Sequence, residues 1–260
     1  MSIAPATRVA MVRPFTSRVV RGVVPLRSEP DDAAELVDEA HYGERMTRLG
    51  ARGEWTYVQG RDLYLGWIRT THLGDHESRD DCLVAVPFAA VRSAPDDAAT
   101  IVDELPAGVS LGSVGREGRW SLIGPDRWIR TDQTIDLAMI PERYPTAGDL
   151  LATATGFLGV PYLWGGTSAH GIDCSGFTQQ VYRLNGVGLV RDADQQALGG
   201  RPVDQARPGD LFFFGADRVT HAAIATGERA FIHAPQSGMS VQRGELTDLS
   251  PLRAIRRYLP

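Results

Sequence analysis

The pattern of hydrophobic and polar residues changes once along the chain, at about Pro141. Before this point, short β-rich runs alternate with turns that contain Gly, Pro and Asp, a pattern typical of small β-barrels. After it, Asp149 follows Thr146 by three residues, as in a capping box, which predicts the start of a helix. The apolar residues at helical spacing in this segment are Leu150, Leu151, Ala154, Phe157 and Leu158. Gly159 and Pro161 are expected to end the helix.

A second helix and an antiparallel sheet are predicted in the rest of the chain. Apolar residues fall on one face of a helix that starts at Cys174, and Asn185-Gly186 closes it. Strand-like runs follow at 210–214, 220–224, 230–233 and around 254–259. A helix followed by such a sheet is an α+β arrangement, which we expect to span residues 145–260.

The first half of the chain contains a duplication. Residues 24–34 (VPLRSEPDDAA) match residues 89–99 (AAVRSAPDDAA) at a shift of 65. The sequence Trp-Ile-Arg-Thr occurs at 67–70 and again at 128–131, at a shift of 61. The two copies therefore predict two domains of the same fold.

The copies differ in length. Because the shift falls from 65 to 61, the first copy carries four extra residues in the segment from Gln59 to Leu65. Each copy has about the length of one small barrel, and two copies are too few for a solenoid. The predicted β-barrel domains are residues 15–76 and 80–136.

Composition and charge exclude several classes of function. The net charge is −5 and no block of Lys or Arg occurs, so nucleic acid is not an expected partner. No stretch approaches the roughly 18 apolar residues of a membrane helix. The N-terminal sequence MSIAPATRVAMVRPF has no sustained apolar core, so we expect neither a signal peptide nor an anchor, and a cytoplasmic location. Two cysteines, Cys82 and Cys174, cannot build a disulfide framework.

Cys174 is the strongest candidate for chemistry. It stands at a predicted helix start, inside the sequence DCSG and behind a glycine-rich turn. A helix N-terminus and a nearby imidazolium stabilise a thiolate, so we expect the pKa of this thiol to lie below its usual value. His221 begins a strand and is the expected general base, and His233, on the next strand, is expected to orient it. The N–H of Cys174 is expected to help bind the oxyanion.

Other roles for these residues stay open. A zinc site is an alternative, although no closely spaced ligand pair occurs, and its ligands would be Cys174, His170, His221 and His233. Cys82 lies near the join between the repeats and is expected to be buried and inert. The remaining histidines stand in polar, loop-like contexts and are expected to be solvated: His41, His72 and His76.

These motifs resemble the NlpC-type papain-like cysteine peptidases of bacterial cell-wall metabolism. The resemblance covers roughly residues 146–260 and rests on PYLWGG, DCSG, RPGDL and the two histidine strands. The repeats resemble bacterial SH3-like modules, and the whole order of domains resembles the γ-D-glutamyl-L-diamino acid endopeptidases. The resemblance implies a papain-like fold and a triad of Cys174, His221 and His233, with Tyr162 near the oxyanion site.

The resemblance also implies a pocket that binds the free amine of an N-terminal L-Ala. The residues that match its motifs, or that are expected to contact substrate, are Asp173, Ser175, Arg191 and Trp164. Asp173 is the expected carboxylate partner of the amine, since a buried cation needs one. The family commonly has a hydroxyl residue soon after the Arg, where this chain has Ala193-Asp194.

The first SH3-like module is expected to reach the same pocket. Tyr64 lies inside the four-residue excess, so the second copy has no counterpart of it. Glu29 is replaced by Ala94 in the second copy and is the expected second carboxylate. This asymmetry indicates that the first module has a role that the second lacks.

The implied function is hydrolysis of the bond between γ-D-Glu and L-Lys or meso-diaminopimelate in free murein stem peptides, within cell-wall peptide recycling. No cofactor, metal, nucleic acid or membrane partner is expected. Two alternatives remain: a non-catalytic cell-wall-binding or scaffold protein, and an acyl or amide transferase on the same thiol fold.

Overall fold

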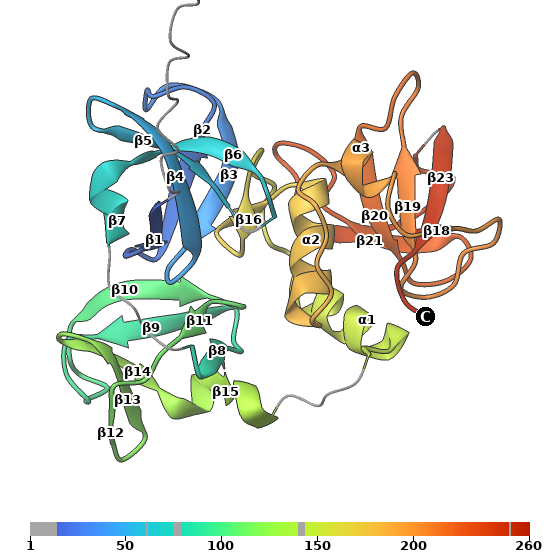
Figure 1. The fold of residues 1–260 in the computed structure, drawn as a ribbon. Helices are drawn as coiled ribbons and strands as arrows, with labels where there is room; N and C mark the ends of the chain where they lie inside the picture. The colour runs from blue at the N-terminus through green and yellow to red at the C-terminus, as the bar shows by residue number, and fades with distance from the viewer. Residues whose placement is uncertain (1–14, 61, 75–79, 140–143, 250) are drawn as a thin grey trace, which may run out of the picture.

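The computed structural model describes residues 15–60, 62–74, 80–139, 144–249 and 251–260, which form two β modules and a third, mixed domain (Figure 1). The modules lie one above the other, and the third domain lies beside them (Figure 1). Residues 1–14, which carry the expectation about an export signal, and His76 lie outside the described residues. Within the described ranges, no helix has the length and apolar character needed to cross a membrane.

The first module is one antiparallel sheet with strand order β3-β2-β6-β5-β4-β1-β7. Inward-facing residues alternate with outward-facing ones along β2, where Val24 and Leu26 are buried against Ile68 of β6. Its elements are β1 (Phe15–Val19), β2 (Val23–Arg27), β3 (Leu36–His41), β4 (Arg45–Arg52), β5 (Trp55–Gln59), β6 (Leu65–Arg69), η1 (Thr70–His72) and β7 (Leu73–Gly74).

The second module repeats this pattern. Arg27 Nη1 donates to the Ala34 carbonyl in the first copy, and Arg92 Nη1 donates to the Ala99 carbonyl in the second. Its sheets have the orders β10-β9-β14-β13-β12 and β11-β8-β15. The elements are β8 (Cys82–Val84), β9 (Phe88–Arg92), β10 (Ile101–Pro106), β11 (Ser110–Leu111), β12 (Gly115–Glu117), β13 (Trp120–Gly124), β14 (Arg127–Arg130), η2 (Thr131–Gln133), β15 (Thr134–Asp136) and η3 (Leu137–Met139).

The third domain has the predicted α+β arrangement, with helices packed on a sheet of order β18-β23-β19-β20-β21-β22. Thr146 and Asp149 form the expected capping box of α1, although the helix ends at Gly156, earlier than predicted. The elements are α1 (Ala147–Gly156), β16 (Thr167–Ser168), β17 (Gly171–Ile172), α2 (Cys174–Leu184), α3 (Ala193–Gln196), β18 (Arg201–Pro202), β19 (Leu211–Phe214), β20 (His221–Ala225), β21 (Ala230–His233), β22 (Gln242–Glu245) and β23 (Leu252–Arg257).

The central strands of this sheet are buried on both faces. In β19, Leu211 and Phe213 pack in the same core as α2, whereas Phe212 and Phe214 pack with Phe231 on the opposite face. This explains the uninterrupted apolar run, because a strand covered on both sides has no solvent face. The sheet therefore gives β20 and β21, which carry the two histidines, a rigid base.

The first module docks on the third domain through polar contacts of β3. Glu39 Oε2 accepts a hydrogen bond from the Thr167 N–H at 2.8 Å, and His41 Nε2 bonds to Thr167 Oγ1 at 3.1 Å. Gly165, at φ +73°, faces the Leu36 carbonyl, and an added Cβ would lie 2.4 Å from its oxygen. A side chain at residue 165 would therefore push the module away.

Two expectations about isolated residues are wrong. His41 is not a solvated loop residue: it ends β3 and is 1% exposed, because it lies in the contact between the first module and the third domain. Cys82 is half-buried rather than buried, in β8 of the second module, where burial and then Asp81 raise its pKa to about 12. His72 is half-buried in η1.

Candidate active site

The sulfur of Cys174 lies at the N-terminus of α2, as the sequence predicts. Asp173 caps the helix by accepting a hydrogen bond from the Gly176 N–H at 2.7 Å. An added Cβ on Gly176 would lie 2.3 Å from the Gly166 carbonyl oxygen, so this position admits glycine alone. Cys174 is 8% exposed and lines a cavity of about 440 Å³.

The two predicted histidines meet beside the cysteine. His221 Nε2 and His233 Nδ1 are 2.8 Å apart, on the neighbouring strands β20 and β21. The N–H of Ala222, next to His221, donates to the sulfur of Cys174. Because Nε2 of His221 is engaged by His233, its Nδ1 is the nitrogen that remains for the thiol. The structure therefore pairs His221 with His233 and places the residue next to His221 in contact with the sulfur of Cys174.

Burial dominates the electrostatics of the Cys174 thiol. Burial, and then the carboxylate of Asp173, raise the pKa of Cys174 to about 12, although the Ala222 N–H opposes the rise. Burial lowers the pKa of His221 to about 3, with a further contribution from His233, whose own pKa burial lowers to about 4. The expectation of a lowered thiol pKa is wrong here, since desolvation outweighs the helix terminus. With these shifts the thiol and both imidazoles are neutral, so attack by the sulfur requires that a base take up the thiol proton.

Arg191 joins the cysteine loop to the first module. Its guanidinium donates to Asp173 Oδ1 at 3.0 Å and Oδ2 at 2.5 Å, and to Asp38 Oδ1 at 2.8 Å. Ser175 Oγ accepts a further bond at 3.0 Å. Burial acts against the charge of Arg191, but Asp173 and Asp38 outweigh it and raise its pKa. Burial also raises the pKa of Asp38, and Arg191 opposes that rise.

Both oxygens of Asp173 are thus occupied before any substrate arrives. Besides Arg191, Oδ2 accepts from the Gly165 N–H at 2.9 Å, and Oδ1 accepts from Ser175 Oγ at 3.2 Å as well as from Gly176. The expectation that Asp173 pairs with a substrate amine is not supported by this geometry. Its observed role is to cap α2 and hold the glycine turn.

Other carboxylates line the cavity, namely Glu35, Asp192 and Asp194. Tyr64 reaches in from the first module, as expected, and its hydroxyl donates to Asp192 Oδ1 at 3.3 Å. Glu29 is exposed and is not among the residues that line the cavity. The carboxylate that the first module contributes to the cavity is Glu35, which was not among the predicted site residues although the matching position in the second copy is Thr100.

Tyr162 and Trp164 also line the cavity. Burial, and then the neighbouring Cys174 and Asp173, raise the pKa of Tyr162, so its hydroxyl keeps its proton and can donate. Trp164 is 60% exposed, and its Nε1 donates to Glu35 Oε1 at 2.8 Å. The indole thus forms a wall between the cysteine loop and the first module.

His170, one ligand of the alternative zinc site, lies elsewhere. Its ring packs on Phe88 of the second module, with centroids 4.3 Å apart. Among the described residues, no group of three or more metal-ligating side chains is assembled. The zinc set is therefore not brought together as proposed.

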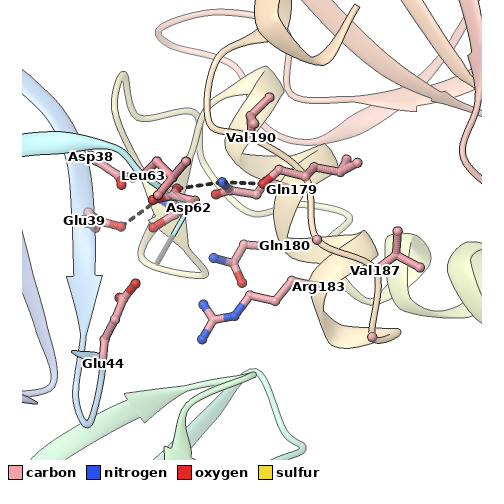
Figure 2. A pocket seen from close by; sticks show the side chains of 14 residues that line it. Asp38, Glu39, Glu44, Asp62, Leu63, Gln179, Gln180, Arg183, Val187 and Val190 are labelled. Carbon is pink, nitrogen blue, oxygen red and sulfur yellow. Dashed lines mark hydrogen bonds between the residues drawn. The ribbon is translucent and has the colours of Figure 1, made fainter. Parts of the chain in front are cut away.

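A larger cavity of about 530 Å³ lies between the first module and α2 (Figure 2). Figure 2 shows Asp62 bonded to Gln179, with Glu44 and Arg183 below, and the Asp62 Oδ2–Gln179 Nε2 distance is 2.9 Å. None of its lining residues is a cysteine or histidine. The smaller cavity, which holds Cys174, is therefore the candidate site.

Comparisons with known proteins indicate which families the chain is similar to. Residues 159–251 match the NlpC/P60 family, and residues 26–73 match the bacterial dipeptidyl-peptidase SH3 domain. A γ-D-glutamyl-L-lysine dipeptidyl-peptidase of Bacillus subtilis is 29% identical over 239 residues, covering 83% of this chain and 79% of the relative. Dipeptidyl-peptidase 6 of Lysinibacillus sphaericus is 28% identical, covering 90% and 93%. The crystal structure of an NlpC/P60 family protein from Bacillus cereus superposes with a TM-score of 0.82 at 25% identity, covering 94% of this chain and 100% of that one.

Proposed function

Since this chain is a cysteine peptidase of the NlpC/P60 family with an N-terminal bacterial SH3 domain, we propose that it cleaves murein stem peptides between γ-D-Glu and the diamino acid. The proposed substrates are L-Ala-γ-D-Glu-L-Lys and its diaminopimelate form, with an unblocked L-Ala. The observation that carries the proposal is a cavity in which Cys174 faces carboxylates contributed partly by the first module.

The geometry supports acyl transfer through a thioester. Cys174 Sγ attacks the γ-carbonyl of D-Glu while His221 accepts the thiol proton, and His233 holds the ring of His221 in place. The N–H of Cys174, at the first position of α2, and the hydroxyl of Tyr162 stabilise the oxyanion. His221 then protonates the leaving amine of the diamino acid. Water, deprotonated by His221, hydrolyses the thioester and releases L-Ala-γ-D-Glu.

The carboxylates of Glu35 and Asp192 are the proposed partners of the L-Ala ammonium. Each lines the cavity and accepts from neutral donors: Glu35 from Trp164 Nε1, and Asp192 from the Tyr64 hydroxyl and from Gln195 Nε2. Burial raises the pKa of Asp192, and a cationic amine would counter that effect. An ammonium would add charge-assisted bonds at the remaining lone pairs of these carboxylates.

An amide nitrogen cannot replace this ammonium, because an N-acylated peptide would leave the carboxylates unpaired. The enzyme would spare intact wall, in which L-Ala is joined to muramic acid, and act on released peptides. We propose a cytoplasmic role in recycling for this reason, and cell fractionation with an antibody against the chain tests it. Recovery of the chain in the wall fraction would contradict that location.

The test of the pocket compares two substrates. We expect N-acetylation of the L-Ala to lower kcat/KM by at least about a hundredfold, since a site built for a polar group rejects an analogue that cannot pair with it. Equal rates would reject the amine pocket. Mass spectrometry of the products formed in the presence of added amines distinguishes hydrolysis from transfer of the acyl group. Tight binding to murein without turnover would favour a scaffold protein.

A further inference from the structure

The two arginines that line the catalytic cavity differ in their ion pairs. Two guanidiniums line it, those of Arg191 and Arg218. Arg191 is 2% exposed and is held by Asp38 and Asp173. Arg218 is exposed, and within the part of the chain that the structure describes it forms no ion pair. Of these two guanidiniums, that of Arg218 can therefore pair with an anionic group of a substrate.

The backbone fixes Arg218 three residues before His221. An added Cβ on Gly215, at φ +147°, would lie 1.9 Å from the Arg218 carbonyl oxygen, so the turn closes tightly only with glycine. The Thr220 N–H donates to the Phe214 carbonyl at 2.9 Å and closes the same loop between β19 and β20. The position of Arg218 beside the reaction centre is thus set by the sheet that carries the general base.

The proposed substrate has an anion that needs such a partner. In a γ-linked D-Glu the α-carboxylate is free, a few bonds from the carbonyl that Cys174 attacks. The cavity is otherwise lined by four carboxylates, Glu35, Asp173, Asp192 and Asp194. The α-carboxylate of the substrate would be repelled by these four carboxylates, which would weaken binding unless a cation paired with it.

We infer that Arg218 binds the α-carboxylate of D-Glu and thereby selects γ-D-Glu over its neutral α-amide. Guanidinium binds carboxylate through two parallel N–H bonds, which gives geometric selectivity as well as charge. The acyl half of the substrate is then recognised at two points: its ammonium by carboxylates that include Glu35 of the first module, and its carboxylate by Arg218. This inference rests on the proposed function, since it concerns the same substrate.

Arg218 also lines an adjoining cavity of about 450 Å³, together with Asp194, Arg253 and Arg256. In that cavity Arg253 Nη1 donates to the Ala216 carbonyl and Arg256 Nε to the Ala197 carbonyl, so both side chains are tied to backbone. Arg218 has no such bond among the described residues, which leaves its guanidinium able to turn toward the substrate.

The test uses two peptides and four proteins. The peptides are L-Ala-γ-D-Glu-L-Lys and the same tripeptide with the D-Glu α-carboxylate replaced by a carboxamide. The proteins are the native enzyme, Arg218→Gln, Arg218→Lys and the control Arg229→Gln, which removes an exposed charge in the turn after β20. We expect the native enzyme to prefer the carboxylate peptide by about tenfold in kcat/KM, as for a charge-assisted pair.

Arg218→Gln should abolish the preference by slowing the carboxylate peptide alone, Arg218→Lys should keep part of it, and Arg229→Gln should keep all of it. Equal turnover of both peptides by the native enzyme, or a preference that survives Arg218→Gln, would overturn the inference while leaving the proposed function intact. Failure of the native enzyme to cut either peptide would overturn both.

Discussion

Removal of the Arg191 guanidinium tests how the first module is joined to the cysteine loop. In Arg191→Met, the carboxylates of Asp38 and Asp173 would stay buried without their cation. Breaking a buried pair in this way costs about 3–5 kcal/mol. Asp173 keeps bonds from backbone N–H groups and Asp38 can take up a proton, so we expect the lower end, about 3 kcal/mol. For a protein of this size the melting temperature would fall by about 6–12 °C.

The assay is thermal unfolding followed by circular dichroism, together with kcat/KM on the tripeptide. The control is Arg257→Met, which removes the partner of Asp210, a buried carboxylate that does not line the cavity. Both variants should lose stability, but only Arg191→Met should also lose at least about tenfold in kcat/KM, because Asp173 caps the helix of the nucleophile. Native stability and activity in Arg191→Met would show that this guanidinium does not join the first module to the cysteine loop.

Three further outcomes are expected. Because burial lowers the pKa of His221 from an ordinary 6.5 to about 3, kcat/KM should stay constant as the pH is lowered to about 5. The contribution of the neutral histidine to folding stability is complete above its pKa in the unfolded chain and is lost as the pH falls toward 3. A fall in kcat/KM with an apparent pKa of 6.5 would contradict this. Tyr64→Phe should raise KM severalfold for the free-amine peptide and leave the N-acetyl peptide unaffected, so equal changes on both peptides would reject a role at the amine. Gly165→Ala should lower activity at least about tenfold by a clash with the first module, whereas Gly156→Ala, with open space at its Cβ, should not; kinetics of the two variants decide the matter.

The part of the site that the sequence predicts is the part encoded by local pattern. Cys174 follows a capping residue, and the histidines begin and end apolar strands, so helix and strand periodicity places them. The repeat likewise predicted that the first module differs from the second, because Tyr64 falls in an unmatched segment. These features depend on few long-range contacts.

The remaining features depend on packing between domains. Asp38 and Arg191 are 153 residues apart in sequence, so no local pattern predicts their ion pair. Nor does any local pattern indicate that Arg191 also pairs with Asp173. The raised thiol pKa reflects burial, which the helix terminus does not offset. Glu29 and Glu35 both lack an acidic counterpart in the second copy, and only the docking of β3 distinguishes them.

Cys174 is proposed to cleave one bond, that between γ-D-Glu and the diamino acid. Mass spectrometry of L-Ala-γ-D-Glu-L-Lys after incubation with the native enzyme should show L-Ala-γ-D-Glu and L-Lys as the products, and Cys174→Ala should leave the tripeptide intact. A cut at the L-Ala bond, an unchanged tripeptide with the native enzyme, or cleavage that persists in Cys174→Ala would contradict the account.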